Sequence, residues 1–89
     1  MRALWKGLFM AKKEDLKDWL IEGLKEKGGT ASIVDVCKNI WGKYQDELID
    51  SGDLFYTWQY DIRWAATLLR KEGKIKSKEI SPKGLWELT

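Results

Sequence analysis

Apolar side chains recur at steps of three and four residues from position 12 to position 27, and charged residues fill most positions between them. This spacing places the apolar residues on one side of a helix. A glycine pair at 28–29 follows, and glycine is common just past a helix end. The pattern predicts an amphipathic helix over residues 12–27, with its apolar side formed by Leu16, Trp19, Leu20 and Leu24.

A second helix is predicted to begin after Ser32. Ser is a preferred N-cap residue, and Asp35 stands three residues later, as in a shortened capping box. Residues 30–32 before it allow a short strand. The apolar positions expected on one side of this helix are Ile33, Val36, Cys37, Ile40 and Trp41, continued by Tyr44 and Leu48. Because Gly42 weakens the helix, either the helix persists to Leu48 or a separate turn follows. A break is expected at residues 50–53.

The third helix is predicted to start near Thr57 and to end at Gly73. Its buried side is expected to hold Trp58, Ile62, Ala65 and Leu69, and its exposed side Gln59, Tyr60, Arg63, Thr67, Arg70 and Lys71. The two flanking residues, Trp64 and Leu68, are expected to contact another element. The exposed side is thus cationic and rich in hydrogen-bond donors.

Residues 74–89 have a different pattern. Polar and apolar residues alternate over 74–78, which predicts an edge strand with three outward lysines. Ser81–Gly84 has the residue preferences of a type I turn. Residues 85–89 are expected to form the return strand, with Trp86 and Leu88 on one face. A β-hairpin over 74–89 is the prediction.

The order of these elements predicts the fold class. The chain has 89 residues, enough for one domain. Helix, short strand, helix, helix and hairpin is the order of a winged helix-turn-helix, a mainly α fold with a small β-hairpin. We expect residues 11–89 to form this domain and residues 1–10 to be an N-terminal extension or an added helical turn.

Two stretches suggest a family. Residues 64–75, WAATLLRKEGKI, and residues 81–89, SPKGLWELT, resemble the N-terminal domain of Mrr-type restriction system proteins. The resemblance implies a winged-helix fold that recognises DNA, usually fused to a nuclease domain. The sequence departs from this pattern in having a long connection over 43–56 before the third helix and no second domain.

Charge is distributed unevenly. The whole chain has a net charge of +2, but residues 30–56 hold two basic and five acidic residues, whereas residues 57–89 hold seven basic and four acidic ones. A basic stretch beside an acidic one orients a protein toward a polyanion. The C-terminal third is therefore the part expected to meet nucleic acid.

Double-stranded DNA is the expected partner. A helix fits the major groove, where Gln59 could pair with adenine and Arg63 with guanine. The basic hairpin is expected to follow phosphates or a minor groove. The full expected DNA-binding set is Thr57, Gln59, Tyr60, Arg63, Thr67, Arg70, Lys71, Lys74, Lys76, Lys78 and Lys83. The alternative is that the helix side is only solvated and that the lysines only prevent edge-to-edge aggregation.

Catalysis is not expected. The sequence has no histidine and one cysteine, so it lacks Ser-His and Cys-His pairs and the usual zinc ligands. Cys37 falls on the apolar side of the second helix and is expected to be buried and inert. The acidic residues over 46–53 do not match a calcium loop. No catalytic residue, metal or cofactor is predicted.

The biological setting is less constrained. We expect a prokaryotic cytoplasmic or nucleoid protein, acting in transcription control or as the reader of a restriction system, with no membrane association. A separately encoded nuclease or another protein could be a partner, and a homodimer is left open. The rival function is a protein-interaction module, which could use an apolar patch formed by Leu4, Trp5, Leu8 and Phe9.

Overall fold

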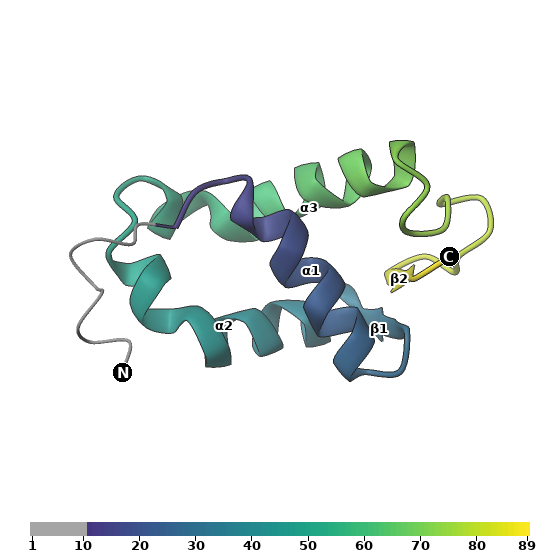
Figure 1. Cartoon of the computed structure of the whole chain (residues 1–89), viewed down its shortest axis with the longest axis horizontal. Coiled ribbons are helices and arrows are strands. Elements are labelled where there is room, and N and C mark those ends of the chain that lie inside the picture. The colour runs from purple at the N-terminus through teal and green to yellow at the C-terminus, as the bar shows by residue number, and fades with distance from the viewer. Residues whose placement is uncertain (1–10) are drawn as a thin grey trace.

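Three helices and a small antiparallel sheet make up the structure, a computed structural model that describes residues 11–89. The elements in chain order are α1 (Asp15–Glu26), β1 (Thr30–Ser32), α2 (Ile33–Ile49), α3 (Leu54–Lys71) and β2 (Leu85–Glu87). In Figure 1, α2 and α3 run along the two long sides, α1 crosses in front of them, and the sheet lies at one end beside the C-terminus. This confirms a mainly α fold with a small β component. The predicted extension over residues 1–10 lies outside the described residues.

Helix α1 packs on both other helices, as its apolar side predicts. The four predicted residues of that side are all buried. The helix begins three residues later than expected because residues 12–14 form a turn, in which the Lys12 amide donates to Asp15 Oδ2 at 2.8 Å. At the other end, Gly28 has a φ of +82°, a value that glycine adopts without strain.

Helix α2 has the predicted cap and persists beyond Gly42. The Asp35 amide donates to Ser32 Oγ at 3.0 Å, which satisfies one of the free N–H groups at the helix start. Residues 43–49 lie between the two alternatives: they are helical, but the backbone at Tyr44 is not (φ −119°, ψ 23°), so α2 is two helical segments joined at a kink. The Tyr44 ring stacks on Trp19 of α1 with ring centroids 4.0 Å apart.

Helix α3 begins at Leu54, three residues before the predicted start. The prediction was late because the turn residues over 50–53 directly precede two apolar residues that belong to the helix. Leu54 is buried, and the Phe55 ring lies 6.4 Å from the Trp41 ring. Burial of Leu54 in the core and packing of Phe55 near Trp41 of α2 favour the helix from its first turn. The predicted buried residues of α3 are confirmed, and Trp64 and Leu68 are half-buried.

The predicted C-terminal hairpin is only partly present. Residues 74–78 do not form a strand; Ile75 alone makes a bridge, to Leu88. Its side chain is buried, and beyond it the amides of Ile80 and Ser81 both donate to the Ser77 carbonyl. This local turn takes the backbone away from the sheet, which is why the alternating pattern gives no second strand.

Strand β2 instead pairs with β1. The two strands are antiparallel, with Ala31 opposite Trp86. The turn before β2 is also displaced by one residue from the prediction: the Leu85 amide donates to the Pro82 carbonyl, so the turn is 82–85 and not 81–84. Gly84 is its third residue and has a φ of +83°, a feature of type II and not of type I turns.

One apolar core joins all the elements. Its fully buried side chains are Leu16, Leu20, Leu24, Val36, Ile40, Leu48, Ile62, Leu69 and Ile75. Trp86 of β2 is 2% exposed and closes this core at the sheet end, and Leu88 packs against it, as predicted. No helix among residues 11–89 is long and apolar enough to cross a membrane.

Candidate functional site: a cationic groove

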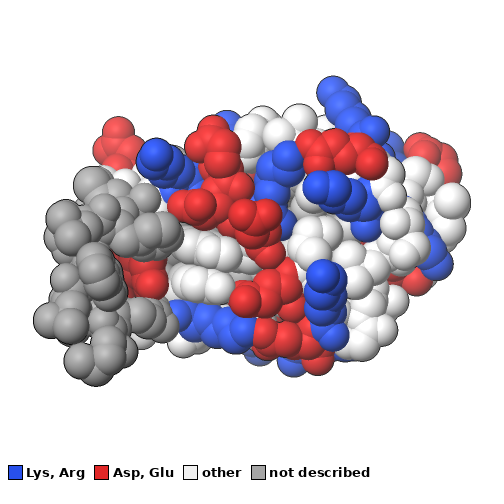
Figure 2. Space-filling model, in the orientation of Figure 1, with Lys and Arg blue, Asp and Glu red and all other residues white. Residues whose placement is uncertain are grey.

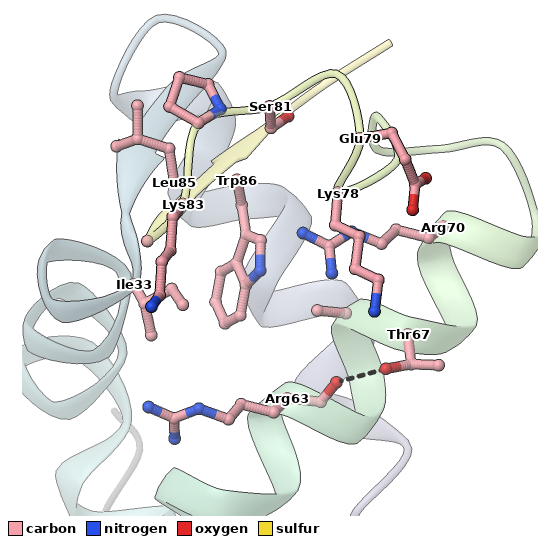
Figure 3. Close-up of a pocket in the computed structure, with 13 residues that line it drawn as sticks. Ile33, Arg63, Thr67, Arg70, Lys78, Glu79, Ser81, Lys83, Leu85 and Trp86 are labelled. Atoms are coloured by element: carbon pink, nitrogen blue, oxygen red, sulfur yellow. Dashed lines mark hydrogen bonds between the residues drawn. The ribbon is translucent and has the colours of Figure 1, made fainter.

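A groove of about 530 Å³ separates the C-terminal half of α3 from the segment that leads into β2. We call it the C-terminal groove. Helix α3 contributes Arg63, Thr67 and Arg70, and the segment 78–84 contributes Lys78, Ser81 and Lys83, while Ile33 and Trp86 line its apolar part. In Figure 3, the Trp86 ring lies between these two walls. The fold therefore brings together residues from three parts of the sequence: Ile33, the second half of α3 and the segment 78–86.

Four cations line this groove, and we call them the groove cations: Arg63, Arg70, Lys78 and Lys83. Among residues 11–89, none of the four has a carboxylate within 4.0 Å. Glu79 is the acidic residue in the lining, and its carboxylate forms no ion pair with them. An anion entering the groove would thus meet positive charge that the described part of the chain leaves uncompensated.

Several cations elsewhere are paired with carboxylates. Lys17 of α1 lies 2.6 Å from Glu72 Oε2, and Lys43 of α2 contacts Glu22 and Glu26 of α1. Figure 2 shows the face over α1, where acidic and basic side chains are interleaved. The carboxyl pKa of Glu72 is lowered, chiefly by the hydrogen bond from Lys17 and also by the positive charges of Lys17 and Lys74. This face is therefore close to neutral locally, in contrast with the groove.

Backbone hydrogen bonds hold the two arginines of the groove. Arg70 Nε donates to the Lys76 carbonyl at 3.2 Å, and Arg63 Nη1 donates to the Gln59 carbonyl at 3.0 Å. The Thr67 hydroxyl donates to the Arg63 carbonyl at 3.1 Å (Figure 3). A guanidinium has five N–H donors, so each arginine keeps donors for a ligand after making its backbone bond. Each backbone bond thus orients its arginine side chain, and the remaining N–H donors can bind a ligand.

Ser81 is a feature of the groove that the sequence analysis missed. The residue is 6% exposed, and its Oγ is buried without a hydrogen-bond partner. The sequence placed Ser81 only as the first residue of a turn, and no local pattern indicates that its side chain faces inward. Trp86 was expected as a core residue, and the structure adds that it also lines the groove.

Of the four lysines expected on the hairpin, only two line the groove. Lys78 and Lys83 do so, whereas Lys74 Nζ lies 3.5 Å from Glu72 Oε1 and Lys76 Nζ lies 3.6 Å from Glu87 Oε2. These two lysines therefore have carboxylates to compensate them. Lys71 is exposed at the end of α3 but does not line the groove.

The remaining expected residues lie on the N-terminal half of α3, outside the C-terminal groove. The Thr57 hydroxyl donates to Asp61 Oδ2 at 2.7 Å, which engages it within the helix. Tyr60 is 75% exposed, and Tyr56, one turn earlier, is 82% exposed. Gln59 is exposed as well. The expected DNA-binding residues of α3 are thus divided between its two halves, and those of the second half include the groove residues Arg63, Thr67 and Arg70.

Gln59 lines a second cavity of about 340 Å³ between α2 and α3. Trp41 and Trp58 form part of its apolar wall, and Arg63 borders both this cavity and the C-terminal groove. Cys37 also lines it and is half-buried, where the sequence predicted full burial. Burial raises the pKa of the Cys37 thiol, and the positive charge of Arg63 offsets part of this effect.

Metal ligands do not gather in the described part of the chain: within residues 11–89 there is no group of three His, Cys, Asp or Glu side chains that could hold a metal ion. What the C-terminal groove offers chemically is positive charge and hydrogen-bond donors. Arg and Lys side chains carry donors only, and such a site suits an anion.

Comparison with known proteins adds no relative. No family model matches the sequence, and no curated protein or solved structure matches it either. Functional inference therefore rests on the groove and on the order of the elements.

Proposed function

We propose that this protein binds double-stranded DNA, without catalysing a reaction on it, through the C-terminal groove and the exposed side of α3. The observation that carries this proposal is the uncompensated charge of the four groove cations, which lie on two separate segments and converge on one concave surface. DNA presents a regular array of phosphates, and neutralising them is the main source of non-specific affinity.

The order and pairing of the elements support the same proposal. Strand β2 pairs with β1 on one side, and Leu88 just after β2 pairs with Ile75 on the other. This arrangement, together with three helices, is what a winged helix-turn-helix would have, with residues 76–84 as the wing. The resemblance of residues 64–75 and 81–89 to the N-terminal domain of Mrr-type restriction system proteins points the same way. A reader module of a restriction or regulatory system is the role we propose.

Charge also suggests where the phosphates lie. The first half of α3 follows Asp53 and contains Asp61, whereas its second half holds Arg63, Arg70 and Lys71. Phosphates are repelled by the first half and attracted by the second. We therefore propose that the DNA backbone passes over the C-terminal half of α3 and the wing. Gln59 and Tyr60 would then face base edges or sugars.

The decisive experiment is a DNA titration at several salt concentrations. Fluorescence anisotropy of a labelled random duplex is followed with the wild-type chain and with the double variant Arg63→Glu/Lys83→Glu. If all four groove cations contact phosphates, log affinity falls with log salt at a slope of about −3.6. The double variant is expected to lose binding.

A matched double variant controls for net charge. Lys12→Glu/Lys27→Glu makes the same charge change at exposed positions outside the groove. It is expected to bind with nearly wild-type affinity. Equal losses in the two double variants would show that net charge alone matters. Absence of binding at low salt would refute the proposal.

A second function, binding of a protein partner, is favoured by one observation. Tyr56 and Tyr60 are large, exposed and one helical turn apart, beside the acidic start of α3. Exposed aromatic side chains are enriched in protein interfaces. If they join two copies of this chain, sedimentation will show association that the variant Tyr56→Ser/Tyr60→Ser lacks. The apolar patch expected over residues 4–9 lies outside the described residues.

A further inference from the structure

The Ser81 hydroxyl is buried in the free protein without a hydrogen-bond partner in the described chain. The residue itself lines the C-terminal groove. Buried hydroxyl groups in folded proteins are nearly always bonded, because an unbonded one has lost water without a replacement. An exception in a native structure calls for an explanation, such as a ligand.

A second buried serine, Ser51, does form a hydrogen bond and serves as the comparison. Ser51, in the turn between α2 and α3, is 9% exposed, and its Oγ donates to the Leu48 carbonyl at 2.6 Å. The two serines are thus similar in burial and differ in bonding. Ser81, the unbonded one, is the one that lines a groove with four uncompensated cations.

We propose that the C-terminal groove binds one phosphate group at a defined subsite, where the Ser81 hydroxyl donates a hydrogen bond to a phosphate oxygen. The groove cations line the same groove and compensate the charge. The proposal deepens the DNA-binding function and rests on it for the source of the phosphate, which is a backbone phosphate of the duplex. Inorganic phosphate offers the same oxygens and serves as the minimal probe.

The geometry of the groove fits this ligand. Figure 3 shows Arg63 and Lys83 on one side of Trp86, and Arg70 and Lys78 on the other. Cations thus approach from both walls, while Ser81 comes from the segment above the ring. The volume of about 530 Å³ exceeds that of a phosphate and leaves room for the sugars on either side of it.

The subsite requires the Ser81 hydroxyl to turn from its enclosed position toward the groove. A serine has three staggered χ1 positions, so rotation about χ1 can move Oγ out of its enclosed position. In the free protein that position gains no hydrogen bond, so little is lost when the side chain turns toward the groove. A phosphate oxygen then supplies an ionised acceptor, which makes a stronger bond than a neutral one.

The test compares Ser81→Ala with Ser51→Ala. Phosphate binding is followed by NMR, from the amide resonances of residues 81–84 and the indole N–H of Trp86, against chloride at equal ionic strength. Duplex binding is followed by anisotropy with a hydroxyl-ended duplex. Ser81→Ala is expected to weaken both by about tenfold, the effect of losing a hydrogen bond to a charged group. Ser51→Ala is expected to leave both unchanged.

Thermal unfolding adds a readout that separates a binding role from a structural one. Because Ser81 Oγ makes no bond in the free protein, Ser81→Ala is expected to melt at or above the wild-type temperature. Ser51→Ala removes a donor from a bonded pair and is expected to melt lower. A lower melting temperature for Ser81→Ala would show that its hydroxyl has a structural partner, and would overturn the subsite.

The outcomes distinguish this inference from the DNA-binding proposal. If phosphate binds through Ser81 but no duplex binds, the subsite stands and the DNA function fails. If the duplex binds Ser81→Ala as tightly as wild type, DNA binding stands and the subsite is overturned. The subsite is also overturned if phosphate moves no groove resonance.

Discussion

Arg70 Nε donates a hydrogen bond to the Lys76 carbonyl at 3.2 Å, so a cation on α3 is tied to the segment that faces it across the C-terminal groove. The bond makes Arg70 both a stabilising residue and a groove cation. Its two roles can be separated, because lysine keeps the charge but lacks the planar guanidinium and its Nε donor.

Arg70→Lys is expected to lower the free energy of unfolding by about 1 kcal/mol, through loss of a half-buried hydrogen bond, and to retain most DNA affinity. Arg70→Gln removes the charge as well and is expected to bind DNA more weakly than Arg70→Lys. Urea unfolding and anisotropy titration give the two quantities. Equal DNA affinities for the two variants would show that the charge of Arg70 has no role in binding.

Gly84 shapes the turn at the edge of the groove. Its φ of +83° is a conformation that an L-residue adopts only with strain, although a Cβ added there meets nothing within 4 Å. Gly84→Ala is therefore expected to cost about 1–2 kcal/mol of stability through backbone strain alone. Gly42→Ala is a suitable comparison, because Gly42 lies within α2 and a Cβ added there also meets nothing within 4 Å. Alanine favours the helix more than glycine does, so this variant is expected to raise the stability of the protein. Urea unfolding of both variants checks the difference in sign.

Glu79 opposes anion binding in the groove. It lines the groove beside the groove cations but forms no ion pair with them. Glu79→Gln removes a repulsive charge at an exposed position, so DNA affinity is expected to rise about two- to fivefold at low salt. The increase should shrink at high salt, because ions screen exposed charges. An unchanged affinity at low salt would place the phosphates away from residues 78–80.

The pair of Lys17 and Glu72 predicts a dependence of stability on pH. The hydrogen bond from Lys17, the first cause, lowers the pKa of Glu72 below its unfolded value. The folded chain therefore binds this proton less tightly than the unfolded chain, and the contribution of Glu72 to stability is fully present above the unfolded carboxyl pKa. It is lost as the pH falls through the lowered folded pKa.

Glu72→Gln and Lys17→Met are each expected to reduce the loss of stability that occurs as the pH falls through the lowered pKa of Glu72. The measurement is urea unfolding over a series of pH values, and the effect is small because the pair is exposed. Lys27→Met provides the control, since Lys27 is an exposed lysine at the end of the same helix, outside the pair. If the three curves coincide with wild type, the pair does not contribute.

Helices were predictable in this chain because their signals are local. The apolar steps of α1, the Ser32 cap of α2 and the buried side of α3 each depend on residues within a few positions of one another. The start of α3 was misplaced because the first turn of the helix depends on tertiary contacts: Leu54 is buried in the core, and Phe55 lies near Trp41 of α2. The short strand over 30–32 was predicted, but its partner was not.

The groove could be predicted only in part, for the same reason. Arg63 and Arg70 follow from helical periodicity, and Lys78 and Lys83 from the basic composition of the segment. Compensation of Lys74 and Lys76 by carboxylates depends on where the chain turns after Ile75, which the alternating pattern does not encode. The inward position of Ser81 depends on the same turn. Local sequence therefore predicted which elements carry the cations, but not which of these cations line the groove together.

The pairing of β1 with β2 has a consequence for how the fold is gained and lost. Thr30 and Glu87, which face each other in this sheet, are separated by 57 positions in the sequence. Closing so large a loop has an entropic cost that local helix formation avoids, and contacts between distant residues slow folding. We therefore expect the helices to gain structure first and the sheet to close late. The wall of the groove formed by residues 78–86 would then be the last part to form and the first to open under mild denaturation, so that binding would fail before the helices melt.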